Sequence, residues 1–259
     1  MTAPTLLLAD LGGTNTRVAL AEGRKVRHDT IRRIPNKDHP NLDSVLKTYL
    51  QAEGRPGVDG ACVAAAGPVR DGIAEMTNLS WVIRPEDIAA VTGAADVAIL
   101  NDLQAQGHAL GHLTPGTTRQ VLPGQPQGAG ASQLVVGVGT GFNAAPVHEG
   151  RGGRIVAASE CGHVALPVRT PAELSLTLFV QQTHGYPEVE EVLSGRGVER
   201  VYEWVTTEAG APARRTAADI MAAIDAGEPL ALRTGEVFVR ALGAVVGDLA
   251  LIHLPFGGI

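Results

Sequence analysis

The sequence predicts an α/β protein built from two similar lobes. A strand, a glycine-rich tip and a second strand occur at Leu6–Leu20 and again at Gln133–Val147. Each copy is followed by a further strand and a helix, which indicates a duplicated unit. Between the copies, the small apolar residues of Gly60–Ala66 are typical of a strand buried on both faces, as in a sheet covered by helices.

The first glycine-rich tip has the residue types of a phosphate site. An apolar strand ends in an acid and is followed by glycines and small polar residues: Asp10, Gly12, Gly13, Thr14 and Asn15. Such glycines can take positive φ and let backbone N–H groups approach an anion, and Thr14 and Asn15 add side-chain donors. Asp10 can hold a hydrated Mg²⁺. Taken alone, the turn fits a tight hairpin equally well, with its glycines serving only the chain reversal.

A second tip of the same kind favours the phosphate interpretation. It contains Gly139, Thr140 and Gly141, and a predicted strand flanks it on each side. Two such tips on two similar lobes would hold one polyphosphate between them. We predict a small N-terminal lobe at residues 1–112 and a larger C-terminal lobe at residues 113–259.

Periodicity and cap residues predict the remaining elements. In the first lobe these are a third strand at Lys25–Ile34, a helix from Asn41 or Asp43 to about Glu53, a short strand at Ile73–Trp81, a helix at Pro85–Val91, a strand at Asp96–Leu100 and a helix at Leu103–Leu113. In the second lobe they are a strand at Arg154–Ala158, a helix with a capping box at Thr170, and helices at Ser194–Glu208, Thr216–Ala226 and Glu228–Leu254.

The composition argues against several classes of function. A formal charge of −6 and a pI near 5.7 argue against nucleic acid as the main partner. The two cysteines lie far apart and fit a reducing compartment better than a disulfide framework. Asp10 interrupts the N-terminal apolar run, and Asp248 and His253 interrupt the last one, so neither a signal peptide nor a membrane span is predicted. We therefore expect a cytoplasmic protein.

Other catalytic motifs fit poorly. The Gly-x-x-x-x-Gly-Lys-Ser/Thr P-loop is absent from the sequence, and the second tip differs from the dinucleotide fingerprint. His108 and His112 have the spacing of a zinc helix, but Ala109 stands where a metalloprotease has its glutamate. We assign no zinc.

The motifs of both lobes, in this order and spacing, resemble those of the bacterial glucokinases, members of the hexokinase/actin-like ATPase superfamily. The matching motifs are Asp10-Leu-Gly-Gly-Thr-Asn, Leu100-Asn-Asp-Leu, Gly137-x-Gly-Thr-Gly, Glu160-x-Gly-His and Glu190-x-Val-Leu-Ser-Gly-x-Gly. The resemblance extends to the last residue. It implies a two-lobed, ribonuclease H-like fold and ATP-dependent, Mg²⁺-assisted phosphorylation of glucose to glucose 6-phosphate.

The resemblance also implies roles for individual residues. Asp102 would be the general base, since phosphoryl transfer needs a base at the attacking hydroxyl. It closes a buried strand, where an acid needs a partner or a function, although it can also cap the following helix. Asn101 would orient the sugar, and Glu160, His163 and Glu190 match the other sugar ligands. Outside this family, His163 would pass for a structural histidine and Glu190 for part of a solvated acidic helix start.

Two features depart from the family pattern. Phe142-Asn143 follows the second tip, where the family usually has Leu-Gly, and Asn143 brings bulk beside the phosphates. The chain also stops at Ile259, where the family begins a strand of the second lobe, followed by the adenine-site glycines and a closing helix. We therefore expect weak ATP affinity, little kinase activity, and self-association, for example as a homodimer. The alternative function is a non-catalytic sugar-binding remnant or sensor.

Overall fold

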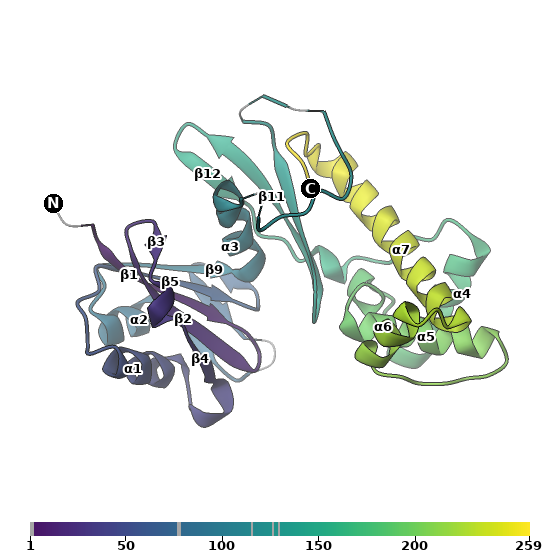
Figure 1. The fold of residues 1–259 in the computed structure, drawn as a ribbon, viewed down its shortest axis with the longest axis horizontal. Helices are drawn as coiled ribbons and strands as arrows, with labels where there is room; N and C mark the ends of the chain where they lie inside the picture. Colours follow the sequence, from purple (N-terminus) through teal and green to yellow (C-terminus); the bar gives the residue numbers. More distant parts are fainter. Residues whose placement is uncertain (1–2, 77–78, 115, 126, 129) are drawn as a thin grey trace. The chain divides into compact units, whose positions relative to one another are not determined.

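The computed structural model describes residues 3–76, 79–114, 116–125, 127–128 and 130–259. The chain divides into two compact units, Met1–Gln106 and Gly107–Ile259, each of which combines a sheet with helices (Figure 1). The helix α3 (Asp102–Ala109) spans the division between residues 106 and 107.

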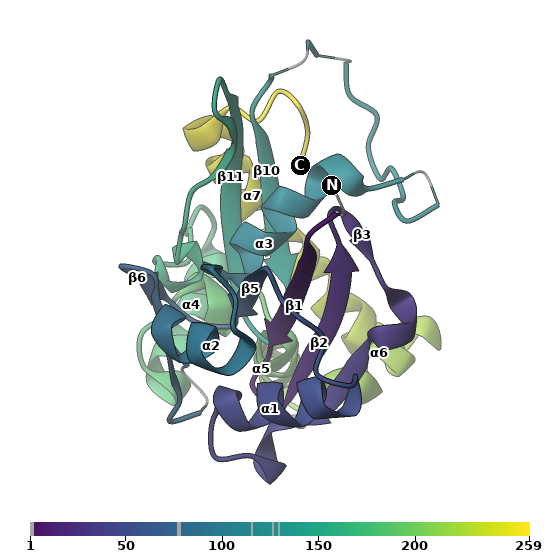
Figure 2. The ribbon, with the colours of Figure 1, turned by 90° about the vertical axis from the view of Figure 1, so that its left-hand side faces the viewer.

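The sheet of the first unit begins with the predicted hairpin. The strands are β1 (Thr5–Leu11), β2 (Asn15–Glu22), β3 (Lys25–Val26), β4 (Arg32–Pro35), β5 (Gly60–Ala65) and β9 (Asp96–Asn101). Their order is β3-β2-β1-β5-β9, with β4 also paired to β2. β1 and β2 run antiparallel and side by side (Figure 2), whereas β1, β5 and β9 are parallel. The carboxyl ends of these three strands therefore meet at one edge.

Two helices pack together beside this sheet. α1 (Leu42–Ala52) starts at Asn41, whose side chain accepts a hydrogen bond from Ser44 N, as the cap prediction requires. α2 (Pro85–Thr92) has proline in its first turn. Leu46, Tyr49 and Ile88 from these helices join the core of the sheet.

Two strand predictions in this unit are wrong in detail. Lys25–Ile34 is interrupted by a 3₁₀ turn at His28–Thr30, because the buried Thr30 hydroxyl accepts from Leu20 N instead of leaving the ladder continuous. Ile73–Trp81 is not one strand. A separate sheet contains β6 (Val69–Arg70), β7 (Ile73–Glu75) and β8 (Val82–Ile83), and residues 77 and 78 lie outside the described part.

The second unit repeats the hairpin. β10 (Gln133–Val138), β11 (Phe142–Gly150) and β12 (Gly153–Val156) form an antiparallel sheet in that order. The last residues of the chain run beside β10, since Gly257 N donates to Ser132 O at 2.8 Å and Leu134 N donates to Gly258 O at 3.0 Å. The duplicated strand–tip–strand–strand pattern is thus confirmed.

Four helices follow this sheet: α4 (Pro171–His184), α5 (Gly195–Glu208), α6 (Ala217–Asp225) and α7 (Pro229–His253). The capping box at Thr170 is present at the start of α4. Along α7, the long yellow helix of Figure 1, Val245 and Leu249 are buried, whereas Leu251 and Ile252 are exposed. Among the described residues, no helix combines the length and the apolar character needed to cross a bilayer.

Candidate functional site

The first tip forms a small polar pocket. Its volume is about 190 Å³, and it is lined by Asp10, Gly12, Thr14, Asn15, Arg17 and Arg33. Gly12 N donates to Asn15 O at 3.1 Å and closes the turn. The expectation of positive φ at Gly12 and Gly13 is wrong, since neither has it. Glycine is favoured at position 12 by the lack of room for a side chain, because a Cβ there would come within 3.3 Å of Asn15 O.

Asn36 forms hydrogen bonds to the backbone of this tip. It is buried, its Nδ2 donates to Gly12 O at 2.8 Å, and its backbone N–H donates to Thr14 O at 2.9 Å. Its Oδ1 accepts from the Thr16 hydroxyl at 2.7 Å. The tip is therefore held in shape by the first residue of a 3₁₀ turn, Asn36–Asp38.

Two arginines complete the pocket. The strand registers place Arg17 of β2 opposite Asp10 of β1 on one side and opposite Arg33 of β4 on the other. Arg17 Nη1 lies 3.4 Å from Asp10 Oδ2. Like charges directly across a ladder repel one another. An anion bound beside Arg17 and Arg33 would reduce that repulsion, so this pair favours anion binding. The sequence analysis missed both, although alternation along β2 could have indicated the face that Arg17 shares with Asp10.

Asn101 and Asp102 lie at the carboxyl end of β9, at the start of α3. Leu103 N donates to Asn101 Oδ1 at 2.9 Å and to Asp102 Oδ1 at 2.8 Å. Asn101 is buried, and its Nδ2 donates to Gly67 O at 3.2 Å. Both side chains therefore cap the helix, which leaves the second carboxylate oxygen of Asp102 for another function.

The two predicted site acids of this unit, Asp10 and Asp102, lie at one edge of the sheet. β5 lies between β1 and β9, so Asp10 and the end of β9 are two strands apart, about 10 Å. Burial raises the pKa of Asp102, the bond from Leu103 N opposes that rise, and the negative charge of Asp10 adds to it. A cation bound near Asp10 would relieve this repulsion.

The second tip rests on Glu190. Phe142 N donates to Glu190 Oε2 at 3.0 Å, and a Cβ on Gly141 would collide with the same oxygen. Gly139 N closes the tip by donating to Gly141 O at 2.9 Å, and Gly139 O accepts from Gly195 N at 2.8 Å. Thr140 is exposed at the tip. A side chain at position 141 would therefore displace the Glu190 carboxylate from its present position.

The three predicted sugar ligands of the second unit lie on two short segments that pack together. Glu160 precedes a 3₁₀ turn at Cys161–His163, and Glu190 lies within another at Val189–Glu191. Val189 N donates to Val164 O at 2.9 Å and joins the two segments. Within this unit, the structure therefore gathers Glu160, His163 and Glu190 beside the second tip.

His163 has a carboxylate partner that the sequence analysis did not single out. Its Nδ1 lies 2.8 Å from Glu188 Oε2. Burial lowers the pKa of His163, but the hydrogen bond to Glu188 and the charges of Glu188, Glu190 and Glu160 outweigh it, so the pKa is raised. The contact directs Nδ1 toward Glu188 and leaves Nε2 for a ligand.

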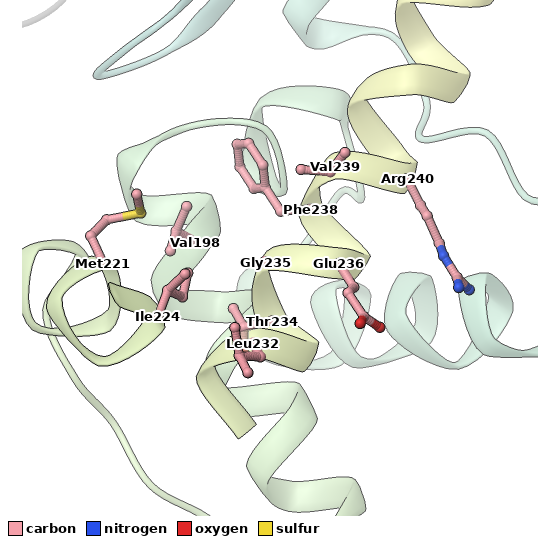
Figure 3. A pocket seen from close by; sticks show the side chains of 10 residues that line it. All are labelled: Val198, Met221, Ile224, Leu232, Thr234, Gly235, Glu236, Phe238, Val239 and Arg240. Atoms are coloured by element: carbon pink, nitrogen blue, oxygen red, sulfur yellow. The ribbon is translucent and has the colours of Figure 1, made fainter. Parts of the chain in front are cut away.

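A larger pocket in the second unit is apolar and contains none of the predicted site residues. It encloses about 660 Å³ among α5, α6 and α7 (Figure 3). Its apolar walls come from Val198 on α5, Met221 and Ile224 on α6, and Leu232 and Phe238 on α7. Thr234, Glu236 and Arg240 of α7 also line it.

Comparison with known proteins identifies the family. A family model described as Glucokinase matches residues 7–259. The chain belongs to the glucokinase family. It is 30% identical over 256 residues to a glucokinase of Brucella abortus biovar 1 (strain 9-941), an alignment that covers 98% of this chain and 74% of the relative. It is 33% identical over 261 residues to a glucokinase of Chromohalobacter salexigens, covering 100% of this chain and 81% of that one.

Solved glucokinase structures share the fold. The glucokinase of an Antarctic psychrotroph superposes with a TM-score of 0.84 at 28% identity and covers 98% of this chain and 81% of its own. The glucokinase of Balamuthia mandrillaris in complex with glucose gives a TM-score of 0.73 at 25% identity, over 96% of this chain and 76% of its own. The predicted two-lobed actin-like ATPase/hexokinase fold is thus confirmed.

Proposed function

We propose that this chain transfers the γ-phosphoryl group of ATP to the 6-hydroxyl of glucose, giving glucose 6-phosphate and ADP. The observation that carries the proposal is membership of the glucokinase family together with two acids, Asp10 and Asp102, at one edge of the first sheet. The sugar oxygen forms a bond to the γ-phosphorus as the bond to the bridging oxygen breaks. The hydroxyl proton passes to Asp102.

The two tips would bind the phosphates. At the first tip, Gly12, Gly13, Thr14 and Asn15 supply N–H and side-chain donors, and Arg17 and Arg33 supply positive charge. At the second, Gly139, Thr140 and Gly141 form a turn without bulky side chains. Phosphoryl transfer depends mainly on such positioning and charge neutralisation.

Asp10 would hold Mg²⁺. Mg²⁺ commonly takes one or two protein carboxylates, with water and substrate phosphates completing its octahedron. Asp10 suits this role because its carboxylate is exposed at the tip pocket and its charge raises the pKa of Asp102. Bound at that position, the ion would screen Asp102 and neutralise charge on the phosphates.

We assign hexose binding to Asn101, Asp102, Glu160, His163 and Glu190. Carboxylates accept hydrogen bonds from vicinal hydroxyls, and an imidazole or an amide can both donate and accept. Asp102 is held by Leu103 N through one oxygen, so its other oxygen can meet the reacting hydroxyl without moving the side chain.

The test is Asp102→Asn, which keeps the shape of the side chain and the cap on Leu103 N. We expect kcat to fall by about 10²–10⁴-fold while glucose binding changes much less, because only the proton acceptor is lost. A coupled assay for ADP and a calorimetric glucose titration measure the two quantities. A variant that keeps near-normal kcat would exclude Asp102 as the base.

The same assays separate the kinase from a non-catalytic sugar-binding protein. A sensor would bind glucose and release no ADP above a control without sugar. The glucokinase relatives align over nearly the whole chain and favour the kinase.

A further inference from the structure

Asn143 joins the second tip to the segment that carries Glu160. It is the second residue of β11. Its Nδ2 donates to Ser159 O at 2.5 Å, and its Oδ1 accepts from Cys161 N at 3.2 Å. These two bonds fix the backbone on either side of Glu160.

Only a primary amide can make this set of bonds. Oδ1 also accepts from Ala144 N at 2.8 Å, and Cys161 Sγ lies 3.6 Å from it. The side chain is half-buried, so a lost bond would leave backbone groups partly shielded from water. Asp has no donor for Ser159 O, and an aliphatic side chain has neither group. The departure from the usual family residue at 143 therefore has a structural consequence.

The start of β11 contacts the other sugar segment as well. Phe142 N donates to Glu190 Oε2 at 3.0 Å. A Cβ on Gly162, two residues after Glu160, would collide with Phe142 O. Phe142 and Asn143 therefore form a common anchor for both segments, directly after the tip at Gly139–Gly141.

We propose that Asn143 is a positioning residue that sets the distance and angle of Glu160 relative to the second tip. The inference rests on the proposed function, in which Glu160 binds the sugar and the tip binds phosphate. The hydroxyl and the γ-phosphate must meet in a narrow range of geometry, and a misplacement of about 1 Å can cost about a hundredfold in rate. Asn143 would transmit that geometry through its hydrogen bonds to the backbone of Ser159 and Cys161.

A double-mutant cycle tests the proposal. We expect Asn143→Ala to lower kcat/KM for glucose by about five- to thirtyfold, the effect of one or two lost hydrogen bonds. In a Glu160→Ala background, the same change should have less than about a twofold effect, because the group being positioned is gone. Asn143→Asp, which replaces the donor with a charged acceptor facing Ser159 O, should lower kcat/KM at least as much as Asn143→Ala.

Thr170→Ala is the matched control for stability. It removes the capping box of α4, outside the contacts described above, and should lower Tm while leaving kcat/KM for glucose unchanged. If Asn143→Ala lowers kcat/KM as much in the Glu160→Ala background as in the parent, the positioning role of Asn143 is wrong, whereas the proposed sugar site is unaffected. An unchanged kcat/KM in Glu160→Ala itself would overturn the sugar site and with it this inference. If Asn143→Ala does not fold, the cycle is run with Asn143→Asp, to which the same criteria apply.

Discussion

The backbone N–H of Phe142 donates to Glu190 Oε2 at 3.0 Å, which anchors a proposed sugar ligand on the hairpin proposed to bind phosphate. Arg196 Nη2 lies 3.5 Å from the other oxygen of the same carboxylate. Glu190 is only partly exposed, so both contacts restrict its orientation. A change in the tip should therefore alter the affinity for glucose, even with no nucleotide present.

Gly141→Ala tests this coupling. Gly141 does not have positive φ, so alanine fits its backbone, but the new methyl group would collide with Glu190 Oε2. We expect glucose affinity without ATP to fall by about tenfold, through loss of a bond to a charged group. Gly139→Ala places the same methyl group in open space and should change glucose affinity much less. Calorimetric glucose titrations of both variants test the prediction, and an equal loss of glucose affinity in the two would contradict the coupling.

Asp102→Asn should stabilise the protein at neutral pH. The pKa of Asp102 is raised by burial, so folding favours its protonated form. Above that raised pKa, the carboxylate is ionised in both states and its burial lowers the free energy of unfolding. Asparagine removes that penalty and keeps the bond from Leu103 N. The gain in Tm should therefore be present at pH 7 and fade as the pH falls through the raised pKa toward about 3.9.

The control is Asp96→Asn, at the exposed opposite end of β9. It should give no comparable gain in Tm at pH 7. Thermal unfolding of both variants from pH 4 to pH 8 checks the prediction. A lower Tm for Asp102→Asn at pH 7 would mean that the carboxylate contributes more through its contacts than it loses through burial.

The sequence predicted features that depend on local pattern. The hairpins follow from apolar strands that flank glycine tips, and the cap at Asn41 follows from its position before an apolar helix. The sequence predicts Asp10 and Asp102 each at the end of an apolar strand, and the parallel pairing of β1, β5 and β9 brings these strand ends to one edge. The duplication of the hairpin predicts two similar α/β lobes.

The remaining contacts depend on register, which local pattern does not specify. Arg33 faces Arg17 only because the 3₁₀ turn at His28–Thr30 offsets β4 along β2. Asn143 and Ser159 are 16 residues apart, and His163 and Glu188 are 25 apart. The glycines of the first tip were predicted for their φ, but the crowding of Gly12 against Asn15 O is what the structure shows.

Glu188→Gln should lower the pKa of His163. The hydrogen bond and the charge of Glu188 are the largest influences that raise that pKa against the effect of burial. The raised pKa stabilises the fold below the unfolded value of about 6.5, and this contribution is lost as the pH rises through the folded value. The Tm of the variant should therefore fall further below that of the parent at pH 5.5 than at pH 9. An NMR titration of the His163 ring in the parent and in the variant checks the shift, and an unchanged midpoint would contradict it.

Arg33→Ala should weaken ATP binding and leave glucose binding intact. Arg33 lines the first tip pocket, lies directly across the ladder from Arg17, and forms no ion pair recorded within the described residues. A bound polyphosphate would relieve the repulsion between the two arginines, so we expect the KM for ATP to rise by about tenfold. The difference should shrink at high salt, because the guanidinium is exposed and its interactions are screened. Arg24→Ala removes the same charge from an exposed turn outside the pocket and is the control. If both variants raise the KM for ATP equally, Arg33 acts only through net charge and the phosphate contact is excluded.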